Sequence, residues 1–325
     1  MSDEHAINST SERRTTKPPL RAAAEVRMMN LFGAALERSS WEGCRRTGAW
    51  LGLLFFTALQ RRRQIAIANV RLAFPHLNEA AARQIARRAS QNFGMTGCEF
   101  LRLRVATPAE ISDYADIDHL EHVQNGLALG QGVLLLTAHL GNWELMGARA
   151  AQQIPLTVVA RPRSNAGVQD YIEEVRAAAG IEVISKFDTA RASLTALRAN
   201  RALGVLPDQY AGASGLLLPF FGHPTRFIPA VAKLGLFTGA PIVPAFGARR
   251  TPWLADGRII ARVFPPLKMP EFARRDAASR DAAIIEGTRR IMRQIEQIVE
   301  RYPDQWLWLH RRWRAEDGVA QALSR

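Results

Sequence analysis

The stretch LLLTAHLGNWELMG, residues 134–147, decides the fold around it. Its consecutive leucines predict a buried β-strand, and Gly141 with Asn142 predicts a turn. Asn142 is also a favourable N-cap for a helix that follows at once. His139 therefore ends the strand, and Glu144 lies in the first turn of the helix.

The same alternation continues along the chain. Strands are predicted for the short apolar runs at 132–138, 155–160, 181–185, 202–206, 216–221, 241–246 and 258–264. Helices are predicted at 142–152, 168–179, 189–199, 229–239 and 279–301. Strands that alternate with helices indicate an α/β fold with a mostly parallel central sheet flanked by helices.

His139 is the residue most suited to chemistry. Ligands of open α/β sheets bind beyond the carboxyl ends of the strands, where this histidine is expected. If Glu144 reaches back to one ring nitrogen, the other nitrogen can remove a proton from a substrate hydroxyl. The reaction would be direct group transfer to an alcohol. The spacing alone leaves open a structural histidine beside a helix-capping carboxylate.

Other chemical motifs fail on their spacing. The GQG at 130–132 precedes a strand and lacks a third glycine, which excludes a dinucleotide fingerprint. Ser214 lacks the second spacer residue of a nucleophile elbow. His119 and His122 have a spacing suited to metal, but we expect them to be surface residues that hold no metal.

Composition limits the partners. The chain has 325 residues, is 47% apolar and carries a net charge of +13, so it can bury a large core and attract an anionic partner. No basic tract alternates with stacking aromatics, which disfavours nucleic acid. Cys44 and Cys98 form neither a disulfide framework nor a metal motif, which indicates a reducing compartment.

The N-terminal part differs in composition from the rest. We expect residues 1–26 to be a disordered tail without a secretory signal, and residues 27–104 to be helical. The apolar segment 47–59 has 13 residues, about 20 Å as a helix, and a bilayer core needs about 20 residues. Flanking arginines and internal aromatics favour a helix lying in a membrane interface. A buried core helix is the alternative.

The HLGNWE sequence at 139–144 resembles a family. A histidine, four residues and an acidic residue form the signature of the lysophospholipid acyltransferase superfamily, and the wider motif resembles the lipid A biosynthesis lauroyl/myristoyl acyltransferases. Further blocks resemble this family in the same order, at 61–75, 91–100, 158–162, 206–210, 218–225, 238–246 and 302–314. The apolar segment 47–59 is shorter than the family's usual anchor, and Tyr210 and Ala211 follow the Asp-Gln pair where the family has acidic residues or glycine.

The resemblance implies a glycerolipid-acyltransferase-like fold and function. The catalytic domain would span 105–314, with a C-terminal tail at 315–325. A fatty acyl chain would pass from an acyl-carrier-protein or coenzyme A thioester to a hydroxyl of a lipid A precursor, at the cytoplasmic face of a bacterial inner membrane, without a cofactor or metal. The alternatives are another glycolipid, a phosphatidylinositol mannoside or an amino-acid lipid as acceptor, and a catalytically silent membrane-bound binding protein.

The resemblance also implies roles for single residues. His139 and Glu144 would be catalytic, and an oxyanion donor would be needed, for which a backbone N–H near Gly141 is a candidate. Substrate would be bound by Asn142, Arg161, Asp208, Gln209, Phe220, Phe221 and Gly222. Simpler interpretations are a solvated loop charge for Arg161, a turn cap for Asp208 and core packing for the Phe-Phe-Gly loop. Residues 306–312 are either a structural edge or an interfacial contact.

Overall fold

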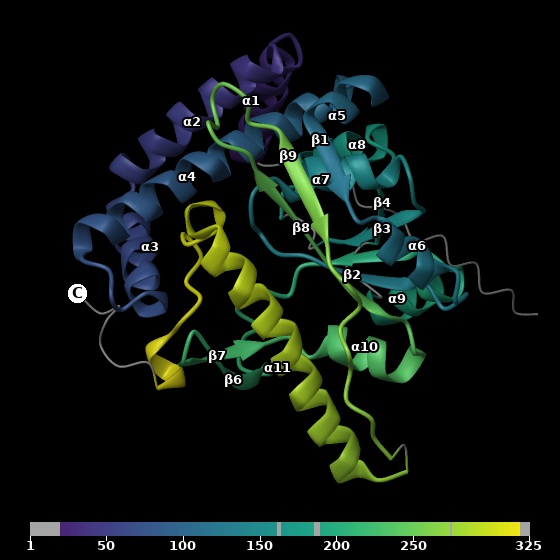
Figure 1. Ribbon diagram of the computed structural model, residues 1–325. Helices are drawn as coiled ribbons and strands as arrows, with labels where there is room; N and C mark the ends of the chain where they lie inside the picture. The colour runs from purple at the N-terminus through teal and green to yellow at the C-terminus, as the bar shows by residue number, and fades with distance from the viewer. Residues whose placement is uncertain (1–19, 161–163, 185–188, 274, 319–325) are drawn as a thin grey trace, which may run out of the picture.

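The computed structural model describes residues 20–160, 164–184, 189–273 and 275–318. It contains a seven-stranded sheet in the order β1-β9-β8-β2-β5-β3-β4 and a separate hairpin of β6 and β7 (Figure 1). The neighbouring strands of the sheet are parallel except for β8 and β9. The strands are β1 (Ala115–Asp118), β2 (Val133–Leu136), β3 (Leu156–Val159), β4 (Glu182–Ile184), β5 (Ala202–Val205), β6 (Leu216–Phe220), β7 (His223–Phe227), β8 (Ile242–Arg249) and β9 (Ile259–Val263).

Helices surround the sheet. They are α1 (Leu20–Glu37), α2 (Trp41–Ala58), α3 (Gln60–Ala73), α4 (Glu79–Arg102), α5 (Pro108–Tyr114), α6 (Glu121–Leu127), α7 (Trp143–Ala151), α8 (Ala166–Ala178), α9 (Thr189–Arg198), α10 (Ala230–Thr238) and α11 (Ala277–Arg301). The mixed α/β architecture with a mostly parallel sheet is the one expected from the sequence.

The central strand β2 is buried on both faces. Its side chains alternate between two core clusters, as successive residues of a strand must. Leu134 and Leu136 pack in the cluster that contains residues of α9, α10 and α11. Val133 and Leu135 pack in the cluster that contains residues of α5, α6, α7 and α8. The run of leucines is apolar throughout because both faces of this strand are covered.

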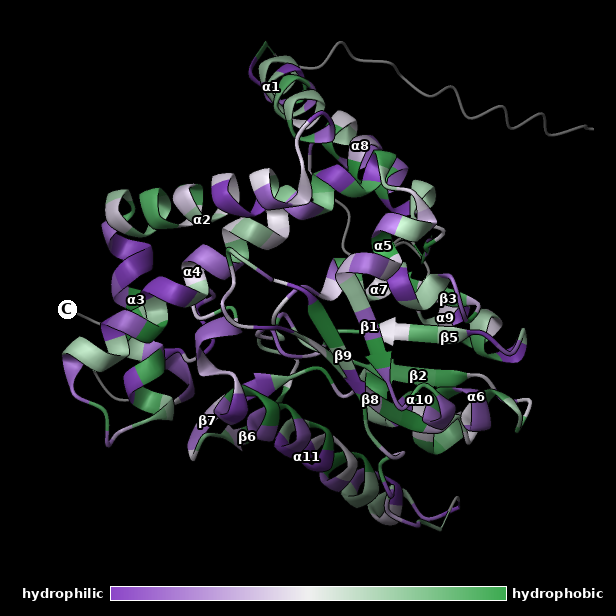
Figure 2. Cartoon of the chain, turned by 45° about the horizontal axis from the view of Figure 1, so that its top comes forward, coloured by the Kyte–Doolittle hydropathy of each residue, from purple (hydrophilic) through white to green (hydrophobic). Residues whose placement is uncertain are grey.

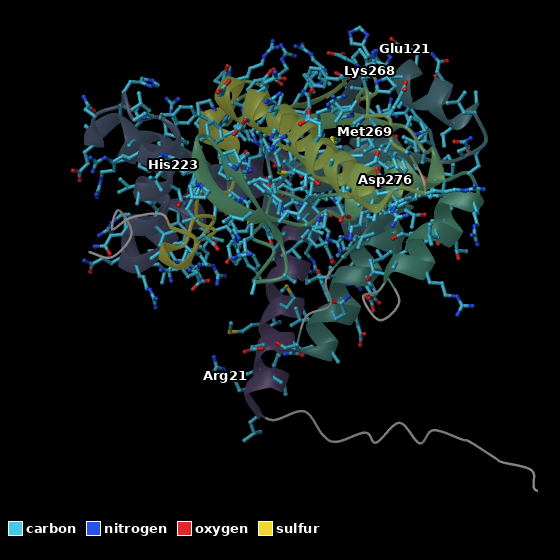
Figure 3. The ribbon with its side chains drawn as sticks, turned by 90° about the horizontal axis from the view of Figure 1, so that it is seen from below. Arg21, Glu121, His223, Lys268, Met269 and Asp276 are labelled. Atoms are coloured by element: carbon cyan, nitrogen blue, oxygen red, sulfur yellow. The ribbon has the colours of Figure 1, made fainter. Side chains whose placement is uncertain are left out.

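Three elements differ from the sequence expectations. Helix α1 begins at Leu20, inside the segment expected to be a tail, and is tied to the catalytic part by hydrogen bonds from Asn165 to Ala22 and Glu25. Figure 3 shows Arg21 near the projecting end of this helix. Strand β1 was not predicted because its ADID sequence has little apolar character, and β7 was missed because it contains Pro224 and Arg226.

Helices α2 and α4 cross in very close contact. A Cβ atom at Gly48 would lie 2.5 Å from the carbonyl oxygen of Gly94, and a Cβ atom at Gly52 would collide with the backbone at Ser90. Glycine is therefore required at the crossing, and the helices α1–α4 form a layer beside the sheet (Figure 1).

A buried ion pair attaches this layer to the sheet. Glu99 of α4 and Arg249 at the end of β8 are 1% and 0% exposed at their side chains, with Arg249 Nη2 2.6 Å from Glu99 Oε2. The guanidinium also places Nη1 2.9 Å from Glu99 Oε1, and its Nε donates to Asn92. This two-point geometry satisfies both charges inside the protein.

We predict that Glu99→Ala lowers the free energy of unfolding by about 3–5 kcal/mol, because Arg249 would remain buried without its counter-charge. Urea denaturation would measure the change. Glu174 is 60% exposed beside Arg104, so Glu174→Ala is the matched control and should change stability by less than about 0.5 kcal/mol. Equal effects of the two substitutions would contradict a dominant role for the buried pair.

Candidate active site

His139 lies at the carboxyl edge of the sheet, three residues beyond the end of β2. Gly141 turns the chain with φ +60°, and a Cβ atom there would collide with the backbone of Gly247 in β8. Asn142 then caps α7 by accepting a hydrogen bond from the N–H of Leu145 at 2.9 Å. The strand, turn and helix follow the order expected from residues 134–147.

The turn is held from two sides. The carbonyl of Gly141 accepts hydrogen bonds from Asn92 at 2.9 Å and Thr96 at 2.7 Å, both on α4. Its N–H donates to the carbonyl of Gln305 at 3.0 Å, from the segment after α11. The backbone that carries His139 is therefore clamped between the N-terminal helices and the C-terminal segment.

Asp208 is the hydrogen-bonding partner of the His139 ring. Its Oδ1 lies 2.7 Å from Nδ1 of His139, and its Oδ2 accepts from the backbone N–H of His139 at 2.9 Å. Trp306 Nε1 donates to the same Oδ2 at 2.9 Å. Asp208 follows β5, which pairs with β2 along the sheet. A buried carboxylate with three donors is a fixed orienting group.

This contact corrects the expectation for Glu144. Glu144 does lie in the first turn of α7, but its carboxylate faces α8, where Arg176 Nη2 is 2.7 Å from Oε1 and Arg176 Nε is 3.2 Å from Oε2. Trp143 also donates to it at 3.2 Å. The His139 ring turns instead toward the neighbouring strand, so Asp208 takes the orienting contact that we expected of Glu144.

The charges around His139 favour its protonated form. Burial lowers the pKa of His139, but the charge of Asp208 and its hydrogen bond raise that pKa by more, with a further contribution from Glu144. Burial raises the pKa of Asp208, but His139 and the three hydrogen bonds lower it to about 2. Asp208 is therefore ionised, Nδ1 carries hydrogen toward it, and Nε2 of the neutral ring is the free base.

Gln209 and Trp143 lie next to that base. Gln209 Nε2 is 3.3 Å from Nε2 of His139. The Trp143 ring packs edge-on against the imidazole with 5.0 Å between ring centroids. The structure thus gathers His139, Asp208 and Gln209 at one point, as the expected site residues at the ends of β2 and β5.

Other expected substrate-binding residues are placed away from the base. Asn142 is completely buried, and its Nδ2 donates to Glu99 at 2.7 Å, so its side chain supports the turn. Phe220 is also fully buried, packed among Phe227, Trp306 and Trp313, which agrees with core packing.

The loop between β6 and β7 is a tight turn. Phe221 and Gly222 have φ values of 49° and 75°, and Phe221 packs edge-on against Phe74 of the segment after α3. They contribute to a hairpin whose tip lies against the segment after α3. Arg161 lies outside the described residues.

The sequence reasoning missed the supporting residues. Trp306 is buried and bridges Leu140, which agrees with a structural edge, and its indole also donates to Asp208, a contact that the sequence did not predict. His310 was grouped with it, and its Nε2 accepts from the backbone N–H of Tyr210 at 3.0 Å. Asn92 and Thr96 of α4 gave no signal beyond a helical pattern. For Trp306 and His310, the sequence indication was their place in the block 302–314, which resembles the family.

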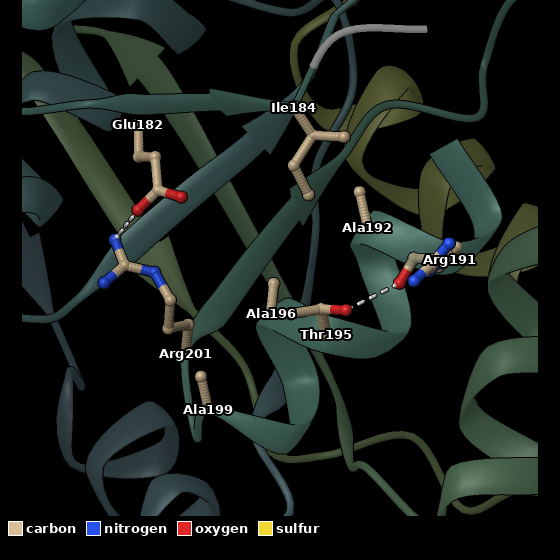
Figure 4. A pocket seen from close by; sticks show the side chains of 8 residues that line it. All are labelled: Glu182, Ile184, Arg191, Ala192, Thr195, Ala196, Ala199 and Arg201. Carbon is tan, nitrogen blue, oxygen red and sulfur yellow. Dashed lines mark hydrogen bonds and ion pairs between the residues drawn. The ribbon is translucent and has the colours of Figure 1, made fainter. Parts of the chain in front are cut away.

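Two features elsewhere do not form a second active site. His119 pairs with Glu121 at 3.1 Å on the surface, and the described residues include no group of three or more side chains arranged to hold a metal. A hollow of about 390 Å³ lies along β4 and α9 (Figure 4). Arg201 in that hollow is paired with Glu182 at 2.8 Å. Arg201 precedes β5 and so lies at the amino edge of the parallel strands, whereas His139 lies at their carboxyl edge.

Residues 28–315 match the family described as bacterial lipid A biosynthesis acyltransferase. The chain belongs to this family. It is 26% identical to the lipid A biosynthesis lauroyltransferase of Escherichia coli, over 84% of this chain and 86% of that protein. It is 26% identical to a phosphatidylinositol mannoside acyltransferase of Mycolicibacterium smegmatis, over 67% and 68%. It is 23% identical to the Escherichia coli lipid A biosynthesis palmitoleoyltransferase, over 82% and 83%.

This family member is therefore an acyltransferase. The resemblance based on HLGNWE and the later sequence blocks is confirmed. Among the described residues, no helix has both the length and the apolar character needed to cross a membrane.

We predict that Asp208→Asn lowers the pKa of His139 more than Glu144→Gln does, because only Asp208 combines charge with a hydrogen bond to the ring. Nitrogen-15 NMR titration of the ring would measure both values against the wild-type pKa, which Asp208 raises above that of an ordinary histidine. Since the base must be neutral, transfer in the wild type should fall as the pH drops through that raised pKa. A larger decrease in Glu144→Gln would assign the partner role to Glu144.

Proposed function

We propose that this acyltransferase moves a fatty acyl chain from an acyl-carrier-protein or coenzyme A thioester to a hydroxyl of a glycolipid, with a lipid A precursor as the acceptor. The observation that carries the proposal is the 2.7 Å contact between Nδ1 of His139 and the buried Asp208 carboxylate, which directs Nδ1–H toward Asp208, so that Nε2 can accept a proton when the ring is neutral. This is the arrangement of a general base. The family and its lipid A relatives support the class of acceptor.

The reaction needs no protein nucleophile. Nε2 of His139 takes the proton of the acceptor hydroxyl while its oxygen attacks the thioester carbonyl carbon. Asp208 stabilises the imidazolium that forms. When the tetrahedral intermediate collapses, the carbon–sulfur bond breaks and the leaving thiolate takes the proton from Nε2. Glu144, paired with Arg176, contributes negative charge near the ring without touching it.

An aromatic row supports the approach of an apolar chain to this base. Phe93 of α4 is 43% exposed, and its ring stacks on Trp143 with centroids 6.3 Å apart. Trp143 in turn packs edge-on against His139, with ring centroids 5.0 Å apart. The three rings lead from an exposed apolar side chain to the reacting nitrogen. We propose that acyl or lipid chains lie along them, and that Arg161 holds an anionic group of a substrate.

A second acceptor class has a specific observation in its favour. The mycobacterial phosphatidylinositol mannoside acyltransferase is as similar in sequence, at 26% identity, as the lauroyltransferase, although over a shorter part of the chain. A mannosylated phosphoinositide is therefore the acceptor to test beside the lipid A precursor.

The location that we propose is the cytoplasmic face of a bacterial inner membrane, through the helices α1 and α2. One face of α2 packs on α4, while Trp50 and Phe55 are 61% and 54% exposed, with Leu54 and Leu59 also exposed. Figure 2 shows apolar ribbon along the C-terminal half of α2. Arg61 and Arg62 at the start of α3 are exposed beside it. Apolar side chains flanked by arginines suit a helix lying in an anionic interface.

We predict that His139→Ala lowers the rate of acyl transfer by about 10²–10⁴-fold, the usual contribution of a general base. Purified protein, acyl-carrier-protein thioester and each candidate glycolipid would be combined, and the products identified by mass spectrometry. His119 is 61% exposed at its side chain and has a φ of 64°, so His119→Asn is a tolerated control that should keep full activity. Wild-type transfer by His139→Ala would refute the mechanism.

We predict that Trp50→Ala combined with Phe55→Ala reduces binding to anionic vesicles by at least about tenfold, since burial of each such side chain is worth roughly 1.5–3 kcal/mol. Flotation with vesicles of phosphatidylglycerol and phosphatidylethanolamine would measure it. Leu129 is 65% exposed in the turn before β2, so Leu129→Ala is the control for loss of exposed apolar surface. High salt should weaken the remaining binding, because charges are screened within about 3 Å at 1 M. Unchanged flotation of the double variant would place the membrane contact elsewhere.

A further inference from the structure

The side chain of Gln209 contacts Nε2 of His139, the atom that must be free to accept a proton in the proposed mechanism. Its side-chain nitrogen is 3.3 Å from Nε2 of His139. Since Nδ1 carries its hydrogen toward Asp208 at 2.7 Å, Nε2 of the neutral ring is an acceptor, and the Gln209 amide is the donor. The amide therefore occupies the position that an acceptor hydroxyl must take before it can give up its proton.

The backbone on either side of Gln209 is held firmly. Asp208 is fixed by Trp306 and by the backbone N–H of His139. The N–H of Tyr210 donates to Nε2 of His310 at 3.0 Å. Burial lowers the pKa of His310 to about 4, which keeps that ring neutral and able to accept. The side chain of Gln209 can therefore change its rotamer beside Nε2 of His139 while the backbone on either side stays in place.

The backbone donors near His139 are already engaged. The N–H of His139 donates to Asp208, that of Leu140 to Ala138, that of Gly141 to Gln305, and that of Asn142 to Gly247. The N–H groups of residues 139–142 therefore have partners inside the protein and are not free to stabilise the oxyanion. A tetrahedral intermediate still requires a donor within about 2.7–3.1 Å of its oxygen.

We propose that Gln209 is a catalytic residue with two successive positions. In the resting enzyme its amide covers Nε2 of His139. The acceptor hydroxyl displaces it, and the hydroxyl oxygen then lies about 3 Å from the carbonyl carbon of the thioester. The displaced amide donates to the carbonyl oxygen of the thioester. This inference rests on the proposed acyl transfer and assigns the oxyanion donor within it.

The proton and electron balance is complete with these groups. The hydroxyl proton passes to Nε2 as the new carbon–oxygen bond forms, and the carbonyl π electrons move to the oxygen that Gln209 then hydrogen-bonds. Collapse restores the carbonyl, breaks the carbon–sulfur bond, and returns the proton from Nε2 to the thiolate. The amide is then free to cover Nε2 again.

The test uses two variants of similar size to the wild type. Gln209→Met removes the amide and keeps the volume, and Gln209→Glu places a carboxylate at the same distance. We expect Gln209→Met to lower kcat by about 10²–10³-fold, as removal of an oxyanion donor does, with KM changed by less than about threefold. A change confined to KM, or a kcat within about threefold of the wild type, would overturn the oxyanion role.

A second readout does not depend on turnover. The ¹⁵N shift of Nε2 of His139 should move in Gln209→Met, because the neutral nitrogen loses its donor. In Gln209→Glu the added carboxylate should raise the pKa of His139 further. The decrease of kcat/KM at low pH should then begin at a higher pH than in the wild type, and kcat should stay as low as in Gln209→Met. The other titratable groups near the ring, Asp208, Glu144 and His310, are the same in all variants. An unchanged Nε2 shift in Gln209→Met would overturn the proposal that the Gln209 amide covers Nε2 of His139 in the resting enzyme.

The controls separate this inference from the proposed function. If His139→Ala is inactive while Gln209→Met turns over normally, acyl transfer stands and the role of Gln209 falls. The remaining donors would then be the first-turn N–H groups of α7. If the wild type acylates none of the glycolipids, the proposed function fails, and the inference that rests on it falls with it. Circular dichroism and thermal unfolding of each variant would verify that the fold is intact.

Discussion

The carboxylate of Asp208 is the group on which the site depends. It is buried, and it accepts hydrogen bonds from the ring of His139, from the backbone of His139 and from the indole of Trp306. These donors come from the end of β2 and from the segment that follows α11. A buried ionised group is stable only where such partners surround it. The position of the His139 ring therefore requires that the sheet has formed and that the C-terminal segment lies against its edge.

A second buried charge connects the N-terminal helices to the same place. Arg249 pairs with Glu99 of α4, and Glu99 also accepts from Asn142, the N-cap of the helix that follows His139. Asn92 and Thr96 on the same helix hold the carbonyl of Gly141. The helix that packs against α2 thus also sets the turn that carries the base. The helical layer that we propose to contact the membrane therefore also contains α4, the helix that holds the turn after His139.

Family membership and site geometry contribute different parts of the function. The family match establishes acyl transfer, and its relatives include enzymes named for lipid A and for phosphatidylinositol mannoside. The geometry suggests how a hydroxyl is activated: Asp208 orients His139, and the Gln209 amide lies over the base. The side chains that discriminate between glycolipids are a separate matter, since in the proposed reaction the residues around Nε2 act on the hydroxyl that all such acceptors carry and on the thioester of the donor.

The amino-acid sequence by itself determined the local units: the buried run of β2, the glycine turn, the Asn142 cap and the placing of His139 at a strand end. These follow from side-chain periodicity and backbone preferences over a few residues. Only the tertiary structure decided which carboxylate touches His139. Glu144 is five residues away and was the natural expectation, whereas Asp208 is 69 residues away. The choice depends on β5 lying beside β2, with Leu136 opposite Val205, and on α8 supplying Arg176 to draw Glu144 aside. Strand order and helix packing are set by the whole core, so no local pattern contains them.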